Sequence, residues 1–493
     1  MFGELFDATP GVLSTLLANL PWLFAGIAVG ITVGLLPGLG GTVGMSVLLP
    51  FIFGVDAEVG IPLLIGMVAI IHTADTFPSI LLGVPGSSGS QATILDGYPL
   101  AKRGQAARAL SAAFSASLIG GLIGAAVLFF ILPVGRDILL VFKAPERVMI
   151  ALLGVAMVGV LAGNRPLRGV AMGFIGLMLG SVGFPPGLQE ARYTFGSVYL
   201  FDGFRLALIA LGIFALPEIL DLLAKRGSIA VQGQAVGSGW LQGIRDTLRS
   251  WFLVLRSAVL GTIVGFIPGL GGAVVDWVSY GLAKSTLRNT EKFGEGDIRG
   301  VIAPESANNA KEGGALIPTI LFGIPGSGAT AVLLGGFFLL GLDPGPALFT
   351  SNIDVVLLIV WSLAAANVFG TMLTSALAPA AAWIASLNIA RLAPFLLVVM
   401  VVGAYQSTRV WGDLWAFLII GLLAWFLRKM RFPVVPLLIG FVLSVTIERQ
   451  LSLATQLQGW SWLAEPTVII MAIVIVVLVA GSLRLQKGAQ IGA

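Results

Sequence analysis

The feature that most constrains this chain is a proline–glycine phrase that occurs twice. Val33–Gly41 reads Val-Gly-Leu-Leu-Pro-Gly-Leu-Gly-Gly, and Val264–Gly272 repeats it with Phe-Ile in place of Leu-Leu. A second pair follows, in which Pro78–Ser87 matches Pro318–Ser327. Two ordered matches at offsets of 231 and 240 residues indicate an internal duplication.

Each copy places Pro-Gly in the middle of an apolar stretch, where proline removes a backbone donor and glycine relaxes the dihedral angles. Within a lipid bilayer, such a break persists only where it is buried in protein or lines a watery cavity. Paired, broken hydrophobic segments in two halves of a membrane protein are the strongest sequence indication of a transporter's binding site.

The composition indicates a membrane protein of the all-α polytopic class. The chain has 493 residues, of which 57% are hydrophobic and only 11% are charged. Apolar stretches of about 20 residues recur from Leu13 to Leu483, which predicts about 12 transmembrane helices together with Gly/Pro-broken re-entrant hairpins. Gly26-xxx-Gly30-xxx-Gly34 and Gly120-xxx-Gly124 have the spacing that lets helix backbones approach closely.

Motifs of the common enzyme classes are missing, so we expect no enzyme and no catalytic residue. The chain has no cysteine and one histidine, His72, which excludes disulfides, thiolate chemistry and a histidine-based metal centre. It has no Walker, Rossmann, His-Glu-x-x-His or Gly-x-Ser-x-Gly pattern. The net charge of +4 reflects basic cytoplasmic loops and predicts no nucleic-acid partner. Met1–Gly11 has no base, so no cleavable signal is expected.

Loop charges predict that the two repeats are inverted relative to each other. In the first copy, the Pro-Gly-Leu-Gly-Gly phrase precedes an acidic loop and the Pro-Gly-Ser phrase precedes a basic one; in the second copy this order is reversed. The acidic loops contain Asp56 and Glu58, and Asp343 and Asp354; the basic loops contain Lys102, Arg103 and Arg108, and Lys284, Arg288, Lys292 and Arg299. The positive-inside rule puts the basic loops in the cytoplasm.

The chain is therefore divided into residues 1–224, a first membrane repeat, and residues 251–493, a second one. Residues 225–250 form the connection, predicted as a cytoplasmic linker because it is rich in Gly, Gln and Ser and flanked by bases. The sidedness of residues 107–222 stays open, since bases occur at every break.

The loops at the breaks are the predicted binding site. A half-helix N-terminus offers free N–H groups and about half a positive charge, which suits a carboxylate, and serine hydroxyls add donors. The substrate-binding candidates are Gly86, Ser87, Ser88, Ser306, Asn308, Asn309, Gly326 and Ser327; the cation-binding candidates, through unwound carbonyls, are Gly38, Gly40, Gly41, Gly269, Gly271 and Gly272. The alternatives are a packed kink without a ligand and, for Pro304–Gly314, a solvated loop or cap.

Charge balance at this site is expected to come from co-bound sodium or protons, with no other cofactor. None of the four breaks contains Lys or Arg, and helix termini alone are too weak to neutralise a di- or trianion. Lys311 is the alternative source of positive charge. His72 and Asp75 share a helix face at i and i+3 and are equally well explained as a structural pair. Asp276 is a weaker cation-ligand candidate.

Several motifs together resemble the large permease subunit of tripartite tricarboxylate transporters. They lie between Gly26 and Phe349 and comprise Pro37–Gly41, Gly83–Ser87, Asp96–Ala101, Pro304–Ala310 and Gly323–Ser327. Many members have Tyr-Gly-Gly-Ser before the first Pro-Gly-Ser loop, whereas this chain has His72-Thr-Ala-Asp75. This departure indicates a divergent branch, and citrate itself is not assigned as the substrate.

The resemblance implies a multi-pass protein of the bacterial inner membrane that imports a carboxylate in symport with sodium or protons. It implies two partners, a small four-helix membrane subunit and a periplasmic substrate-binding protein; a homodimer is also left open. The alternative function is an ion or anion channel whose Gly-rich loops form a filter. A non-transporting scaffold would leave the repeated loops unexplained.

Overall fold

The computed structural model describes residues 2–161, 166–184, 190–224, 236–385, 393–406 and 408–491. Over these residues the chain is helical, and its β-structure is limited to one isolated antiparallel bridge between Gly183 and Arg192. The all-α prediction is confirmed. The segment 225–235 of the predicted linker lies outside the described residues.

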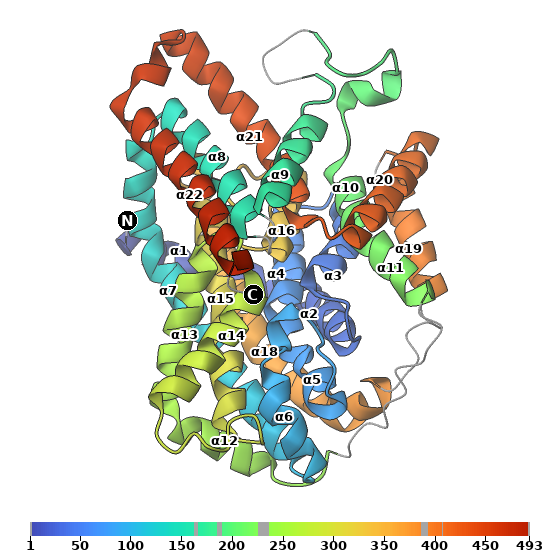
Figure 1. Cartoon of the computed structure of the whole chain (residues 1–493), viewed down its shortest axis with the longest axis vertical. Helices are drawn as coiled ribbons and strands as arrows, with labels where there is room; N and C mark the ends of the chain where they lie inside the picture. The colour runs from blue at the N-terminus through green and yellow to red at the C-terminus, as the bar shows by residue number, and fades with distance from the viewer. Residues whose placement is uncertain are drawn as a thin grey trace.

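Helices therefore make up the architecture, and Figure 1 shows their arrangement. In chain order they are α1 (Phe2–Ala18), α2 (Leu20–Leu35), α3 (Gly41–Leu48), η1 (Leu49–Ile52), α4 (Ala57–Ala74), α5 (Thr76–Leu82), η2 (Ser88–Ser90), α6 (Thr93–Lys102), α7 (Ala106–Val141), α8 (Ala144–Leu161), α9 (Pro166–Gly180), η3 (Val198–Asp202), α10 (Leu206–Ala210), η4 (Leu211–Ala215), α11 (Leu216–Ala224), α12 (Trp240–Arg249), α13 (Trp251–Phe266), α14 (Gly271–Thr286), α15 (Arg299–Phe322), α16 (Gly328–Leu339), α17 (Pro346–Ser351), α18 (Ile353–Ala385), α19 (Ala393–Gln406), α20 (Trp411–Lys429), α21 (Val435–Gln458), η6 (Ser461–Ala464) and α22 (Pro466–Ile491).

Six of the described helical segments are long and apolar enough to cross a membrane. They are Ala57–Leu82, Ala106–Leu139, Leu206–Ala224, Ile353–Ala380, Trp411–Lys429 and Val435–Gln458. The number rises to eight if two bent pairs each count as one span, Gly3–Ala18 with Leu20–Leu35 at 66° and Trp240–Arg249 with Trp251–Phe266 at 75°. The membrane-protein class is thus supported, while the count of about 12 is not confirmed.

The difference from 12 has a physical reason in the breaks themselves. The proline–glycine loops cut potential spans into the short helices α3, α14 and α16, with 8, 16 and 12 residues. A bilayer core about 30 Å thick needs a helix of about 20 residues. Helix α15 is long enough, with 24 residues, but it contains the polar run of Pro304–Gly314, which lowers its hydropathy.

The duplicated phrases fold twice into the same local geometry. Gly38 and Gly269 both have positive φ, 85° and 89°, and so do Gly83 and Gly323, 68° and 65°. Such angles favour glycine, which explains these residues at the turns. In each copy the two loops are joined by one backbone hydrogen bond, from Gly38 N to Gly86 O and from Gly269 N to Gly326 O, both 3.1 Å long.

Small residues allow the helices of the two copies to pack closely. A Cβ at Gly30 of α2 would lie 2.7 Å from the carbonyl oxygen of Met67 in α4, and one at Gly261 of α13 would overlap that of Ala307 in α15. Gly120 and Gly124 of α7 pack in the same way against α15. The glycine spacing predicted to let helix backbones touch therefore does so.

The basic loops of the two copies meet at one end of the molecule, where α6 and α12 lie in Figure 1. The buried Asp96 of α6 accepts hydrogen bonds from the backbone N–H groups of Gly294, Gly296 and Asp297, at 2.8–2.9 Å, and from the hydroxyl of Tyr280. Burial raises the pKa of the Asp96 carboxyl, and these donors lower it again in part. At the acidic loops, by contrast, Leu340 packs against Gly60.

The described part of the predicted linker, residues 236–250, contains a helix that packs on the rest of the protein. Helix α12 packs on α7, where Thr247 Oγ1 donates to the carbonyl of Ala112 at 3.0 Å and Arg108 pairs with Asp246 at 2.6 Å. Two further groups of helices flank the helices that carry the duplicated loops (Figure 1). One group comprises α8, α9, α21 and α22, and the other, on the opposite side, comprises α10, α11, α19 and α20.

We expect the close approach of α13 and α15 to be intolerant of even one methyl group. Gly261→Ala should lower the free energy of unfolding by about 1–3 kcal/mol, because the added Cβ overlaps a backbone oxygen that cannot move aside. Thermal unfolding of the purified protein in detergent, followed by tryptophan fluorescence, measures the change. The matched control is Gly281→Ala on the neighbouring α14, where nothing lies within 4 Å and helix propensity favours Ala. Equal stability of the two variants would contradict the packing.

Candidate functional site

A cavity of about 380 Å³ lies where the loops of the two copies meet. Its wall contains Gly40, Gly41, Thr42, His72, Ser87, Ser88, Val158, Gly269, Leu270, Gly271, Gly272, Lys311, Ser327, Gly328, Ala329, Pro433, Val434, Val435 and Ile439. All four proline–glycine loops contribute to this wall. The duplicated segments, far apart in sequence, therefore line one cavity.

Four α-helices begin at residues of this wall, and three of them begin in the duplicated loops. Gly41 is the first residue of α3, Gly271 of α14 and Gly328 of α16. The first N–H groups of a helix have no partner within the helix and carry a partial positive charge. The cavity is thus bounded by three helix N-termini from the duplicated loops, an arrangement that favours an anion.

The loop serines have a structural role as well. Ser327 caps α16, where its hydroxyl accepts from Thr330 N at 3.2 Å, and Ser87 caps η2, where its hydroxyl accepts from Gly89 N at 3.0 Å. Ser88 lines the cavity without capping a helix, and its side chain is exposed. Ser88 is therefore the loop hydroxyl that can be removed at least structural cost.

Eight of the predicted site residues line the cavity: Gly40, Gly41, Ser87, Ser88, Gly269, Gly271, Gly272 and Ser327. Six others lie outside its wall: Gly38, Gly86, Gly326, Ser306, Asn308 and Asn309. Gly38, Gly86 and Gly326 are engaged in the hydrogen bonds that join the loops. Ser306 donates to Ile302 O within α15 at 2.7 Å.

The polar run that contains Ser306 is buried helix rather than a solvated loop, so that alternative is wrong. Asn308 Nδ2 donates to Gly89 O at 2.9 Å, and Asn309 Nδ2 donates to Thr73 Oγ1 at 2.9 Å. The Oδ1 atoms of both amides are buried without a hydrogen-bond partner. These asparagines join the second copy to the first from behind the cavity wall.

Eleven of the 19 wall residues are absent from the predicted set. Thr42 and Gly328 adjoin predicted loop residues, whereas Pro433–Val435 precede and begin α21 in a region without a motif. Lys311, the alternative source of positive charge, does reach the wall, whereas His72, an ionisable residue in an apolar stretch, was not expected at the loops. Both line the cavity and are buried.

These two side chains belong to a buried charge cluster, defined as His72, Asp75, Lys311 and Glu312. His72 Nε2 lies 2.9 Å from Glu312 Oε1 and 3.3 Å from Lys311 Nζ, and Lys311 also pairs directly with Glu312. His72 Nδ1 lies 3.5 Å from Asp75 Oδ2, which accepts a short hydrogen bond from the Ser87 hydroxyl. The cluster thus extends from α15 to a loop serine.

Two further carboxylates lie buried outside the wall. Glu305 accepts from the hydroxyls of Thr76, Thr93 and Ser117 at 2.8–3.0 Å, and Asp276 Oδ2 accepts from Ala92 N at 2.6 Å. Among the described residues around the loops, four buried acids thus stand against one buried lysine and one histidine. This excess of acid indicates a need for cations or protons.

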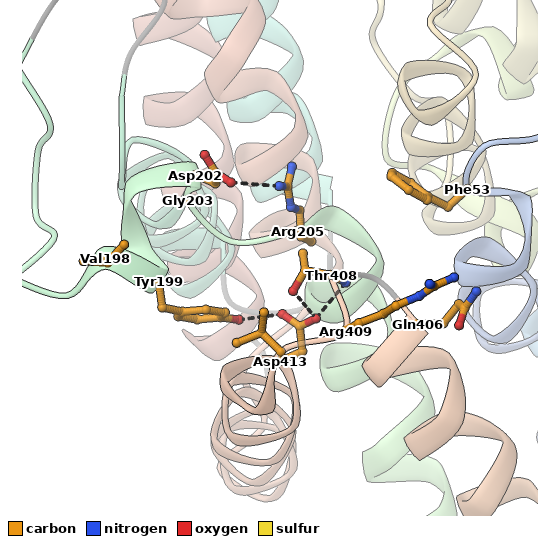
Figure 2. A pocket seen from close by; sticks show the side chains of 11 residues that line it. Phe53, Val198, Tyr199, Asp202, Gly203, Arg205, Gln406, Thr408, Arg409 and Asp413 are labelled. Atoms are coloured by element: carbon orange, nitrogen blue, oxygen red, sulfur yellow. Dashed lines mark hydrogen bonds and ion pairs between the residues drawn. The ribbon is translucent and has the colours of Figure 1, made fainter.

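A larger, more open cavity of about 800 Å³ lies between η3 and the start of α20 (Figure 2). Its carboxylates are already engaged: Asp413 accepts from Tyr199 at 2.9 Å and from Thr408, and Asp202 pairs with Arg205 at 3.1 Å. Burial, reinforced by Asp413, raises the pKa of the Tyr199 phenol, which keeps it a donor. None of the duplicated loops reaches this cavity, so the smaller cavity is the better candidate.

Broken helices that meet at a small cavity, within an apolar helical protein, are typical of membrane transporters. The chain belongs to the tripartite tricarboxylate transporter TctA family, whose model matches residues 20–439. The match extends beyond Phe349, where the motif resemblance ended. The family is one of transporters rather than enzymes, in agreement with the missing enzyme motifs.

Two relatives come from Agrobacterium vitis. One, described as an uncharacterized 52.8 kDa protein in the TAR-I ttuC' 3' region, is 33% identical over 435 residues, covering 88% of this chain and 86% of the relative. The other, an uncharacterized protein in the TAR-II ttuC' 3' region, is 33% identical over 193 residues, covering 39% and 79%. No solved structure matches this chain.

The ion pair in the cavity wall yields a prediction about stability. Lys311→Met should destabilise the protein by about 3–5 kcal/mol, because it leaves Glu312 buried without its cation. The double variant Lys311→Met/Glu312→Gln should recover most of this loss, since both charges are then gone. Lys284→Met, at an exposed position of α14, is the control and should change stability by about 0.5 kcal/mol or less. Thermal unfolding in detergent compares them, and no recovery in the double variant would contradict a direct pair.

Proposed function

We propose that this chain is the permease subunit of a secondary active transporter that imports di- or tricarboxylates through the cavity between the duplicated loops. The observation that carries the proposal is the convergence of three helix N-termini and Lys311 on one cavity. Helix N-termini stabilise carboxylates, and Lys311, although paired with Glu312, brings to the wall an ammonium group that the loops lack. Family membership supports a carboxylate as substrate.

The substrate contacts in this proposal come from Ser87, Ser88, Ser327, Lys311 and the N–H groups at the helix N-termini. The coupling cation is sodium or a proton. Carbonyls of Gly40, Gly41, Gly269, Gly271 and Gly272 are our candidates for a sodium ion, because they line the same cavity. Gly38 supports its loop from outside the wall. The asparagines and Ser306 act as supports for the loops rather than as substrate ligands.

We further propose that residues 1–224 and 251–493 are inverted repeats in a bacterial inner membrane, with the basic loops in the cytoplasm. The arrangement of the loops supports this. The loop after Pro-Gly-Leu-Gly-Gly in the second copy lies against α6, which follows Pro-Gly-Ser in the first copy. Likewise Leu340, after Pro-Gly-Ser in the second copy, packs on Gly60, after the first acidic loop. The basic loop region of one copy thus lies against that of the other copy, and the two acidic loop regions do the same.

The partners proposed from the family are a small four-helix membrane subunit and a periplasmic substrate-binding protein, since the family name itself describes a tripartite system. Helix α20 exposes Ile419, Leu423 and Phe426, an apolar face that suits lipid, the membrane subunit or a second copy of the chain. The binding protein would deliver substrate at low concentration, because the large subunit brings no soluble domain in its described residues.

The inverted arrangement predicts a labelling pattern in this cysteine-free chain. Single cysteines at Asp56 and Asp343 should react in intact cells with a membrane-impermeant thiol reagent, because the acidic loops face outward. Cysteines at Lys102 and Lys292 should react only after the membrane is opened. Equal labelling of Lys102 and Asp343 from outside would contradict the inverted repeats while leaving the carboxylate site untouched.

The proposed function predicts a selective loss of substrate affinity in Ser88→Ala. Removing this hydroxyl should raise the Kd or KM for the carboxylate by about 10- to 100-fold. This factor corresponds to the loss of one hydrogen bond to a charged group, which contributes about 1.5–3 kcal/mol. Stability should be unchanged, since Ser88 caps no helix. The test is uptake into proteoliposomes of a panel of di- and tricarboxylates, with sodium and proton gradients imposed separately and the partner subunits present.

The control for that assay is Ser285→Ala, on the exposed surface of α14, which should transport like the unmodified protein. Currents of single-channel size would favour the channel alternative instead. Absence of uptake for every carboxylate, in either gradient, would exclude the proposed function.

A further inference from the structure

His72 is the one histidine in the sequence, and it lines the cavity between the loops while its side chain is about nine-tenths buried. It lies near the end of α4, one turn before the break that leads into the Pro-Gly-Ser loop. A histidine changes charge near neutral pH, which no other ordinary side chain does. Its surroundings therefore decide what this part of the wall can bind.

The two ring nitrogens of His72 differ, because Nε2 has two partners of different kinds, whereas Nδ1 is buried without a hydrogen-bond partner. Glu312 Oε1, an acceptor, lies 2.9 Å from Nε2, and Lys311 Nζ, a donor, lies 3.3 Å from it. On the other side Nδ1 lies 3.5 Å from the acceptor Asp75 Oδ2. A neutral ring can donate to Asp75 through Nδ1 and accept from Lys311. A protonated ring can donate to both carboxylates.

The charge cluster is therefore built for both states of the ring, but its net charge differs between them. With His72 neutral, two carboxylates face one ammonium and the cluster is negative by one charge. With His72 protonated, two cations balance two anions. A bare negative charge in the wall repels a carboxylate in the cavity, and in a poorly solvated site this repulsion is only weakly screened.

Among the elements that pack against α4, only α15 brings a further buried charge near the ring. Helices α2, α3, α5 and α16 contain no ionisable residue, and α18 has Asp354 in its first turn. The ionisable residues of α1 and α7 lie within two turns of the helix ends. Besides Lys311 and Glu312, only Glu305 of α15 adds charge near the ring. The Glu305 carboxylate accepts hydrogen bonds from the hydroxyls of Thr76, Thr93 and Ser117.

We infer that His72 is a proton-binding site of the carrier and that one proton binds together with the carboxylate substrate, an inference that rests on the proposed function. The proton adds to Nε2, which then donates to Glu312. Lys311 loses its acceptor on the ring and is repelled by the imidazolium, so its ammonium turns to the substrate carboxylate. By linkage, the substrate raises the proton affinity of His72 by the same factor by which the proton raises substrate affinity.

The route from the ring to the loop is short. Asp75 accepts from the Ser87 hydroxyl, and Ser87 caps the turn at the cavity wall. A charge on His72 changes how strongly Asp75 holds that hydroxyl. The proton on His72 therefore acts on both sides of the cavity, through Lys311 on α15 and through Ser87 on the loop.

The single histidine makes a direct test available. Protein labelled with ¹⁵N-histidine and purified through a histidine-free tag gives nitrogen signals from His72 alone, and these report its protonation across about pH 5 to 9. The titration is recorded without ligand and with saturating citrate, or with whichever carboxylate of the uptake panel binds most tightly. We expect the ligand to raise the midpoint by at least about one pH unit, which is a tenfold coupling.

Binding measured in parallel supplies the matched control. In the unmodified protein the carboxylate Kd should rise up to tenfold per pH unit above the midpoint without ligand, and His72→Gln should remove this slope. The variant also gives the baseline for ionisation of the ligand itself. If a carboxylate binds but leaves the His72 midpoint unchanged, the proton site is wrong and the carboxylate carrier stands. If no carboxylate binds at any pH, the proposed function and this inference both fail.

Discussion

The structure depends on one constraint: a backbone break inside an apolar protein must find hydrogen-bond partners in the protein itself. An unsatisfied N–H or C=O in such surroundings costs several kcal/mol. Here each break satisfies the other, because Gly38 donates to Gly86 and Gly269 donates to Gly326. The two loops of one copy therefore stabilise each other. The cavity forms where these two mutually supported pairs meet, and its position follows from the same hydrogen bonds.

Much of this arrangement could be predicted because the duplicated phrases contain proline and glycine, whose backbone conformations differ from those of other residues. Pro37-Gly38 and Pro268-Gly269 predict breaks, and positive φ at both glycines confirms why they are there. The predicted loops do line one cavity, since Ser87, Gly271 and their counterparts share a wall. The number of spans was harder to predict, because apolar content does not distinguish a full span from a half-helix such as α16.

The parts of the site that the sequence did not place are those fixed by tertiary packing alone. Asn308 and Asn309 have the right chemistry for a ligand, yet α15 turns them toward Gly89 and Thr73, where they join the two copies. Lys311, two residues further on, reaches the wall. Which residues of one helix face a cavity depends on its rotation, and a polar run without hydrophobic periodicity gives no indication of that rotation. The sequence gives no indication that Pro433 lines the cavity, since the segment around it belongs to neither duplicated phrase.

Helix α15 also bears on how the site can open. It supplies Lys311 and Glu312 to the cavity, holds η2 through Asn308, and holds α4 and α6 through Asn309 and Glu305. Moving one copy past the other would break these buried polar contacts, each of which is costly to leave unpaired. The contacts of the wall with Pro433–Val435 are apolar by comparison and can be exchanged without such a cost. For the proposed carrier, alternating access is therefore easier to achieve by moving both sets of loops as one body against the flanking helices than by separating the two copies.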